Sequence, residues 1–327
     1  MIIDVHSHLF PPDLMAAIAK AGGRLPQLEA APLQSMALGE RHELMLENQV
    51  DLGALSVGVL QPYHADVRTA ADLAKVANDT YLQTSADSGG WLATWAALPL
   101  PHIDAALAEL DRVAGDEHCI GVTLGTSVLD LDLDDKALEP VYAALNARGT
   151  TVFVHPSMSF DGFGDNDLGM QRSIGGMIED TIAGIRLLLS GVVVRYPRVN
   201  FIVPHLGGTL PFIYGRVRRH IAAAEKKWAE SGLTSPEETH TGLSRLWWDT
   251  ATRHVPALTC AVETLGADRL VFGTDYPYTK TRAEFASRLA HIRDLPVGAE
   301  QQAAVLGGSA AALLGLDKQQ TPRGPQR

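Results

Sequence analysis

The sequence predicts an α/β fold in which eight parallel strands close into a (β/α)8 TIM barrel. Short β-type runs recur along the chain, rich in Val, Ile, Leu and aromatic residues and bounded by Gly, Pro, Asp or Asn. A longer helical pattern follows each run, which is the order expected of parallel βαβ units. Eight such units fit a closed barrel better than an open sheet.

The alternative to the barrel is a doubly wound open sheet of the nucleotide-binding kind. Such a sheet carries a Gly-rich phosphate loop after its first strand, but neither G-x-G-x-x-G nor a Walker A lysine loop follows the first β-type run. That run ends in histidines instead, which favours the barrel.

The predicted elements alternate along the chain. We expect strands at Ile2–His6, Leu52–Leu60, Trp91–Leu98, Cys119–Gly125, Thr151–His155, Asn200–His205, Leu246–Thr250 and Leu270–Thr274. We expect helices at Val67–Ala86, Ile103–Val113, Asp134–Arg148, Ile178–Arg195, Pro211–Ser231, Val255–Leu265, Arg282–Ile292 and Glu300–Leu314. The clearest helix is the third of these, because Asp134 can cap its start and Gly149 can end it.

The chain is expected to form one domain over residues 1–316. A Gly- and Asp-rich insertion near residues 157–177 follows the fifth strand, and a long loop at a barrel mouth commonly covers the substrate. A second long connection, Phe10–Gly39, follows the first strand. The polar tail 317–327 is expected to be flexible.

The composition excludes several classes of protein. With 27 basic and 38 acidic residues the formal charge is −11, which disfavours nucleic acids and anionic membranes as partners. An apolar share of 46% excludes wholesale disorder. Cys119 and Cys260 form no CxxC pair, so neither a disulfide scaffold nor a thiolate zinc finger is expected. We see no membrane-spanning stretch and no signal-peptide pattern, and we expect a cytoplasmic protein.

Polar residues stand where several predicted strands end. His6 and His8 lie two residues apart at the first strand, and residues i and i+2 of a strand point to the same face. His155 ends the fifth strand, His205 the sixth and Asp275 the eighth. The C-terminal ends of all strands in a barrel meet at one mouth, where active sites lie. Because buried His and Asp need partners, we expect these five residues to form one site.

The residue types in this set suit a divalent metal ion. Imidazole nitrogens with one carboxylate favour Zn2+, with Mn2+, Fe2+ or Co2+ as alternatives, and a coordination position left open for water makes such a site catalytic. The fourth predicted strand contains no Lys or Glu that could bridge a second metal ion. One metal ion is therefore expected.

His205 is favoured as a catalytic acid/base. His6, His8, His155 and Asp275 already offer four ligands, and a histidine with a pKa near 6.5 suits proton transfer. The glycines that follow His205 allow a tight turn and a close approach of the backbone to a ligand. The alternative is that His205 is a fifth ligand.

Four further residues are candidates for binding the substrate. Arg172 in the long insertion, or Arg253, can hold a carboxylate through two hydrogen bonds, and Arg24, Arg41 and Arg68 compete for this role. Phe160 can stack on a ring, and His254 follows the seventh strand. Asp249, at the end of the seventh strand, either orients an active-site imidazole or caps the next helix.

Four motifs resemble the amidohydrolase superfamily, and within it the amidohydrolase-related decarboxylases typified by aminocarboxymuconate semialdehyde decarboxylase. They are IIDVHSHLFPP, the strand-end VHP, RYPRVNFIVPHLGGTLPF and VFGTDYPY, in this order along the chain. The resemblance implies a metal-dependent TIM barrel in which His6, His8, His155 and Asp275 hold the metal ion and His205 is the acid/base. The stretch LWWDTATRH also looks like that of members acting on hydroxybenzoate-type acids.

The resemblance implies a mononuclear metal-dependent decarboxylase, with His205 and Asp275 as catalytic residues. Its substrate would be a small unsaturated or aromatic carboxylic acid, no organic cofactor would be needed, and the enzyme would form a homodimer. The alternative reaction on the same site is hydrolysis or hydration of a small lactone, ester, amide or unsaturated acid. A purely structural metal site is disfavoured, because structural zinc sites are closed and typically use Cys ligands.

Overall fold

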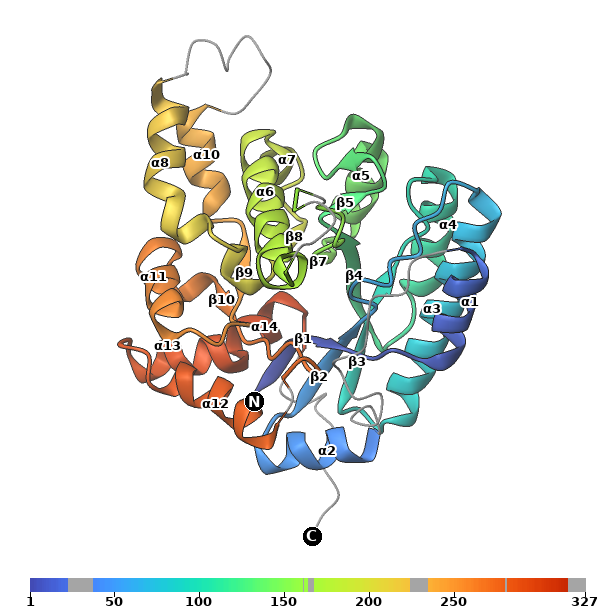
Figure 1. Cartoon of the computed structure of the whole chain (residues 1–327), viewed down its shortest axis with the longest axis horizontal. Coiled ribbons are helices and arrows are strands. Elements are labelled where there is room, and N and C mark those ends of the chain that lie inside the picture. The colour runs from blue at the N-terminus through green and yellow to red at the C-terminus, as the bar shows by residue number, and fades with distance from the viewer. Residues whose placement is uncertain (23–37, 161, 164–167, 224–234, 280, 317–327) are drawn as a thin grey trace.

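The structure, a computed structural model, describes residues 1–22, 38–160, 162–163, 168–223, 235–279 and 281–316, and in these it forms the predicted barrel (Figure 1). Eight strands lie in one sheet, and each pair of neighbours in it is parallel. In sheet order they are β1 (Ile3–His8), β2 (Leu52–Ser56), β3 (Leu92–Ala97), β4 (Cys119–Gly125), β7 (Thr151–His155), β8 (Asn200–Val203), β9 (Trp247–Asp249) and β10 (Leu270–Val271). A hairpin of β5 (Ser127–Val128) and β6 (Leu131–Asp132) stands apart.

Backbone hydrogen bonds join the last strand region to the first and close the barrel. The amide of Val5 donates to the Phe272 carbonyl over 2.9 Å, and the amide of Asp275 donates to the His6 carbonyl over 2.8 Å. Ser7 forms a further bridge with Tyr276. The fold class predicted from the sequence is therefore confirmed.

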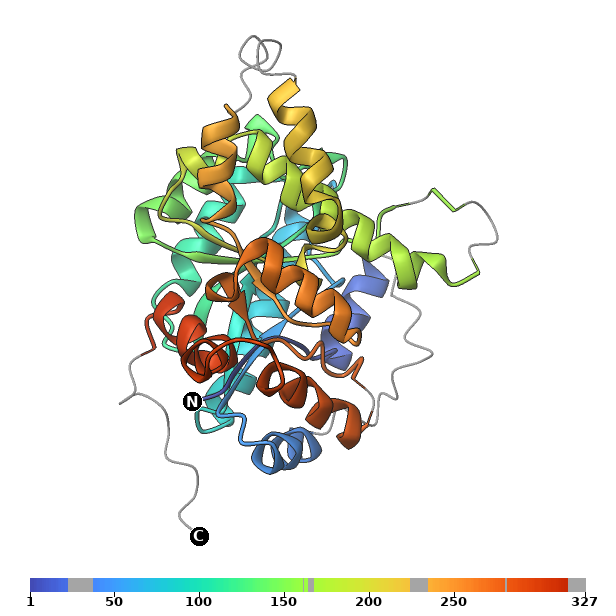
Figure 2. The ribbon, with the colours of Figure 1, turned by 90° about the vertical axis from the view of Figure 1, so that its left-hand side faces the viewer.

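Helices surround the strands in Figure 1. They are α1 (Pro12–Lys20), α2 (Leu38–Glu47), α3 (Val67–Asp87), α4 (Ile103–Val113), α5 (Glu139–Arg148), α6 (Gly176–Leu189), α7 (Val192–Arg195), α8 (Leu210–Ala223), α10 (Pro236–Leu243), α11 (Val255–Leu265), α12 (Arg282–Arg293), α13 (Ala299–Ala303) and α14 (Ser309–Leu313). Figure 2 shows that α8 and α10 stand side by side at one end of the molecule. None of the described helices is both long and apolar enough to cross a membrane.

Several predicted boundaries differ from the structure. The second, sixth and eighth strands end earlier than expected, at Ser56, Val203 and Val271. The sequence did not predict α1, α2 or α10. The single helix expected over Ile178–Arg195 is two helices, because Gly191 adopts a left-handed φ of 76° between them. The tail 317–327 lies outside the described residues.

The helix expected from Asp134 begins later. A 3-10 turn at Lys136–Leu138 comes first, with Asp135 accepting a hydrogen bond from the Ala137 amide, and α5 follows directly. Asp134 does not cap the helix but pairs with Arg186 over 2.6 Å. Gly149 ends α5 at a φ of 68°, as predicted.

A β-bulge in β1 allows this strand to direct both apolar residues and histidines into the barrel interior. Its register with β2 shifts between Asp4 and Ser7. Ile3 and Val5 pack in the apolar cluster that also contains Phe153. The ring of His6, the next residue, lies 4.9 Å from that of Phe153. The odd-numbered apolar residues and the even-numbered histidines therefore face the same interior.

Candidate active site

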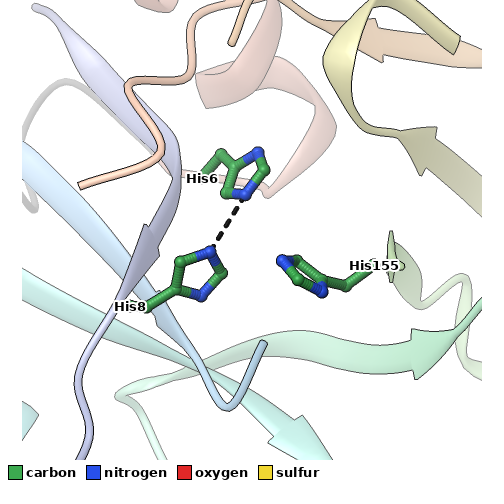
Figure 3. A group of neighbouring side chains, drawn as sticks. All are labelled: His6, His8 and His155. Atoms are coloured by element: carbon green, nitrogen blue, oxygen red, sulfur yellow. Dashed lines mark hydrogen bonds between the residues drawn. The ribbon is translucent and has the colours of Figure 1, made fainter. Parts of the chain in front are cut away.

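Three imidazoles meet at the C-terminal ends of β1 and β7 (Figure 3). His6 and His8 are fully buried, and His155 is buried as well. The Nε2 atoms of His6 and His8 are 3.0 Å apart, and one ring nitrogen of His155 lies within 4.8 Å of a ring nitrogen of each of them. The structure thus brings together the three histidines that the sequence placed on two distant strands.

The second nitrogen of each imidazole faces an oxygen. Nδ1 of His6 is 2.5 Å from Oδ2 of Asp249, and Nδ1 of His8 is 2.9 Å from Oγ of Ser56. Nδ1 of His155 is 3.0 Å from the Pro156 carbonyl. The tautomer that satisfies these contacts has its proton on Nδ1 and presents the Nε2 lone pair to the centre. Metal-binding histidines are held in this way, so the three residues fit a metal ion.

Asp275 completes a compact donor set. Its Oδ1 lies 3.3 Å from Nε2 of His6 and 3.2 Å from Nε2 of His8. With the 3.0 Å between the two Nε2 atoms, these three donors form a triangle of nearly equal sides. Donors bound tetrahedrally to zinc at 2.0–2.1 Å lie about 3.3 Å from one another. The spacing of the protein atoms therefore matches what one small cation needs.

Asp249 orients an imidazole and does not cap a helix. Besides its contact with His6, its Oδ1 accepts hydrogen bonds from the amides of His205 (2.8 Å) and Ala251 (2.9 Å). The following helix, α11, begins after His254 and has no side-chain cap. Of the two roles considered for Asp249, the geometry supports the first.

His205 lies beside the donor set, just beyond the end of β8. Its Nδ1 is 2.9 Å from Oδ2 of Asp180, and its Nε2 is 3.8 Å from Oδ2 of Asp275. His205 and Asp275 were expected as the last residues of strands, but both lie beyond the strands. His205 begins the 3-10 turn His205–Gly207, and the φ angles of the two residues are positive, at 50° and 59°. Such a backbone costs energy for residues other than glycine and is found at functional sites. A side chain at Gly208 would collide with the Met177 carbonyl, so the turn after His205 requires glycine there.

The ionisable groups of the site shift in different directions. Burial alone would raise the pKa of Asp275, but the charge of His6 and the contacts with His205 and His8 hold that pKa well below its usual range. Burial lowers the pKa of His8 and of His155, so both imidazoles are neutral at pH 7. Burial also opposes the charged form of His6, but Asp249 and Asp275 raise its pKa to about 9. A metal ion must displace this proton when it binds.

His205 has the opposite tendency to His8 and His155. Burial opposes its protonation, but its contacts with Asp180 and Asp275 outweigh burial and raise the pKa of the imidazole well above its usual value. A cationic imidazole beside a cation-binding donor set is suited to giving a proton.

The four predicted substrate-binding residues lie on different segments around the mouth. Arg172 is exposed in the turn Gln171–Gly175. Its positive charge acts on Tyr278, where it opposes the rise in the pKa of the phenol that burial causes. The ring centre of Tyr278 is 6.0 Å from that of His8. Arg253 donates to the Tyr278 carbonyl over 2.5 Å. Phe160 packs on Phe163 at a ring distance of 5.1 Å, within the long insertion. His254 is exposed at the start of α11.

Three residues support the site in roles that the sequence did not predict. Asp180 contacts His205 from α6, Ser56 contacts His8 from the end of β2, and Arg41 of α2 donates to Ser7 Oγ and to the His8 carbonyl. Asp180 had one signal, an acidic residue within the apolar helix pattern. Arg41 was considered only as a rival for binding the substrate carboxylate, because α2 was not predicted; of the other rivals, Arg24 lies outside the described residues.

Several known proteins that resemble this chain are decarboxylases, and one is a 2-keto-4-carboxy-3-hexenedioate hydratase of a Sphingobium species, 23% identical over 296 residues. A 2-amino-3-carboxymuconate-6-semialdehyde decarboxylase of Dictyostelium discoideum is 26% identical over 271 residues, covering 83% of this chain and 74% of the relative. A 6-methylsalicylic acid decarboxylase of Penicillium expansum is 29% identical over 280 residues, covering 84% of each. The crystal structure of a 5-carboxyvanillate decarboxylase from Sphingomonas paucimobilis superposes with a TM-score of 0.81 at 25% identity, covering 97% of this chain and 99% of the other.

A more distant structure shares the fold and holds a metal ion. It is a 5-carboxyvanillate decarboxylase of Novosphingobium aromaticivorans in complex with manganese, with a TM-score of 0.80 and 18% identity over 97% of this chain and 96% of the other.

The family assignment rests on nearly the whole chain. The family model described as Amidohydrolase matches residues 3–316, a range that includes all eight barrel strands and every residue of the donor set. With its closed barrel and its histidines at the strand ends, this chain belongs to the amidohydrolase family.

Proposed function

We propose that this chain is a mononuclear metal-dependent decarboxylase of a small aromatic or unsaturated carboxylic acid. The observation that carries the proposal is the meeting of His6, His8, His155 and Asp275 in one donor set, with His205 directly beside it. The similarity to decarboxylases of 6-methylsalicylate and of aminocarboxymuconate semialdehyde supports the reaction class.

Zn2+ is the metal ion that this donor set favours. Three imidazoles and one carboxylate suit zinc, and the spacing of His6, His8 and Asp275 matches tetrahedral coordination, while the manganese in the structural neighbour supports a broader acceptance of divalent ions. A divalent cation held by these residues would supply Lewis acidity, which would stabilise negative charge on a substrate oxygen when CO2 is lost.

His205 moves the proton of the reaction. The carbon–carbon bond to the carboxylate breaks, CO2 leaves, and the carbon that carried it takes a proton from Nε2 of His205. The nearby carboxylate of Asp275, 3.8 Å from Nε2, favours the charged imidazole before the transfer. A positioned acid of this kind contributes about 10²–10⁴-fold to a rate.

Arg172 or Arg253 binds the carboxylate of the substrate, while Phe160 and His254 contact its ring. The support for Arg172 is its charge at Tyr278, which packs against His8. A guanidinium at the mouth lets an anionic substrate enter a site with several carboxylates. Residues 1–316 form one domain, which the match over residues 3–316 supports, and we also propose a homodimer, which light scattering of the purified protein tests.

The test is a substrate screen of the metal-loaded protein. CO2 release is measured from 2-hydroxybenzoates and carboxymuconate-type acids, beside hydrolysis of pyrone lactones and hydration of unsaturated acids. We expect CO2 release from the wild type, and none from His205→Asn, which keeps its metal ion. Hydrolysis or hydration without any CO2 release would overturn the proposed reaction, and an active His205→Asn would overturn the role of His205.

A further inference from the structure

Asp180 is a fully buried carboxylate with one described hydrogen-bond partner. Its side chain is 0% exposed in the second turn of α6, and its Oδ2 lies 2.9 Å from Nδ1 of His205. Its other oxygen, Oδ1, is buried and has no hydrogen-bond partner among the described residues. Burying a carboxylate with so few hydrogen-bond partners costs free energy. We therefore look for the role of Asp180 in its one described contact, the contact with His205.

The neighbouring residue in the same helix, Glu179, is a buried carboxylate with a structural role, and its hydrogen bonds can be compared with those of Asp180. Its Oε2 accepts hydrogen bonds from Thr126 Oγ1 (2.8 Å) and the Met158 amide (2.9 Å), and its Oε1 accepts one from the Phe160 amide (2.8 Å). Glu179 therefore anchors the start of the long insertion, and both of its oxygens are used. Asp180 has no comparable set of backbone donors among the described residues.

We propose that Asp180 is a positioning residue for the proton transfer, which holds His205 with its proton on Nδ1 and its Nε2 directed toward Asp275 and the metal-binding donor set. This inference rests on the proposed function, because it assigns the partner of the acid/base. Asp180 touches neither substrate nor metal ligand in this role; it acts through His205.

Two contacts together fix His205 in space. The backbone amide donates to Asp249, which also holds His6, and the ring is fixed by Asp180 on another element. The ring can therefore neither rotate nor change tautomer without losing a buried hydrogen bond. Correct placement of the reacting nitrogen is worth orders of magnitude in rate, because a small displacement prevents the transfer.

The first test is Asp180→Asn, which keeps the size of the side chain. The amide nitrogen of Asn donates to Nδ1, which leaves no proton on that nitrogen, so the imidazole can no longer be held with protons on both nitrogens. We expect kcat to fall by about 100-fold or more, while KM and bound metal per chain change little. A kcat within about threefold of the wild type would overturn the proposal.

The matched control is Glu179→Gln, which changes the adjacent buried carboxylate in the same way. It loosens the segment that carries Met158 and Phe160, so we expect a higher KM with kcat within about threefold of the wild type. If Glu179→Gln lowers kcat as much as Asp180→Asn does, the effect belongs to the packing of α6, and the positioning role is wrong.

A second readout does not depend on activity. In zinc-loaded protein with 15N-labelled histidine, NMR reports which ring nitrogen of His205 carries the proton, and His205→Asn assigns the signal. We expect a protonated Nδ1 that bonds Asp180 in the wild type, and loss of that Nδ1 proton in Asp180→Asn. An unchanged tautomer in the variant would overturn the inference even if the protein proves to catalyse another reaction. If instead the tautomer changes but His205→Asn still turns over substrate, the positioning stands and the proposed acid/base role fails.

Discussion

The two halves of the barrel interior are built by the same strands but from different chemistry. Toward the N-terminal ends of the strands the interior is an apolar cluster that includes Trp95, Phe153 and Ile202. Toward the C-terminal ends it contains buried imidazoles and carboxylates. On β7 the change takes one step of the strand repeat, because His155 follows Phe153 by two residues and points to the same face.

Because of this difference in chemistry, the apolar half of the interior stabilises the fold and the polar half carries the site. The apolar half gains free energy from burial and close packing, which needs no specific partner. In the polar half, each buried imidazole needs its own hydrogen-bond partner, and Asp249, Ser56 and Asp180 are these partners for His6, His8 and His205. A substitution in the first half should therefore change unfolding, and one in the second half should change metal binding or turnover.

The largest effect is expected from His155→Ala, in the polar half. Removal of one imidazole from the donor set leaves three ligands and opens the site to water. We expect bound metal to fall far below one ion per chain and turnover to fall by at least about 10³-fold, since the loss of a ligand exceeds the 10–100-fold typical of a supporting residue. Metal analysis of the dialysed protein checks this, and full occupancy would remove His155 from the ligand set.

The sequence located the polar half through one general rule. His6, His8, His155, His205 and Asp275 were found because strand ends in a barrel share one mouth, and the order of elements predicted the barrel. That reasoning needs only local patterns and the symmetry of the fold. It therefore predicted that these five residues lie close together, and the structure brings them together.

What the sequence could not predict depends on contacts between distant segments. The bulge in β1 follows from pairing with β2 and leaves no local pattern. Asp134 looked like a helix cap, but an ion pair with Arg186 of α6 competes for it. In the sequence, Asp180 looks like one more polar residue of a surface helix. Its contact with His205 becomes visible only when α6 packs against the turn that contains His205. Tertiary partners decide each of these cases.

A smaller effect is expected from Asp249→Asn, which leaves all ligands in place. The variant loses the charge that orients His6 through a contact of 2.5 Å. We expect metal affinity to fall about 10–100-fold, as is usual when the partner of a metal-binding histidine is changed. A competition titration with a chelating dye measures the affinity.

The control for this prediction is Asp79→Asn, which removes the charge from a solvent-exposed ion pair of the same length. Asp79 lies 2.5 Å from Lys75 on the surface of α3, where both side chains are about half exposed. Exposed pairs contribute only about 0.2–1 kcal/mol to stability, so metal affinity should stay unchanged. Equal losses of metal affinity in both variants would show that net charge matters and not the contact with His6.

The smallest effect is expected from Ile202→Val, in the apolar half. Ile202 is fully buried on β8, the strand that leads to His205, and it packs in the cluster with Trp95 and Phe153. Loss of one methyl group should lower the free energy of unfolding by about 0.5–1.5 kcal/mol, which urea denaturation measures. Metal content and kcat should stay at the wild-type level, because the small cavity that the substitution leaves lies in the apolar half and not among the metal-binding side chains. A loss of bound metal in this variant would mean that packing in the apolar half sets the positions of the imidazoles, and the separation of the two halves would then be wrong.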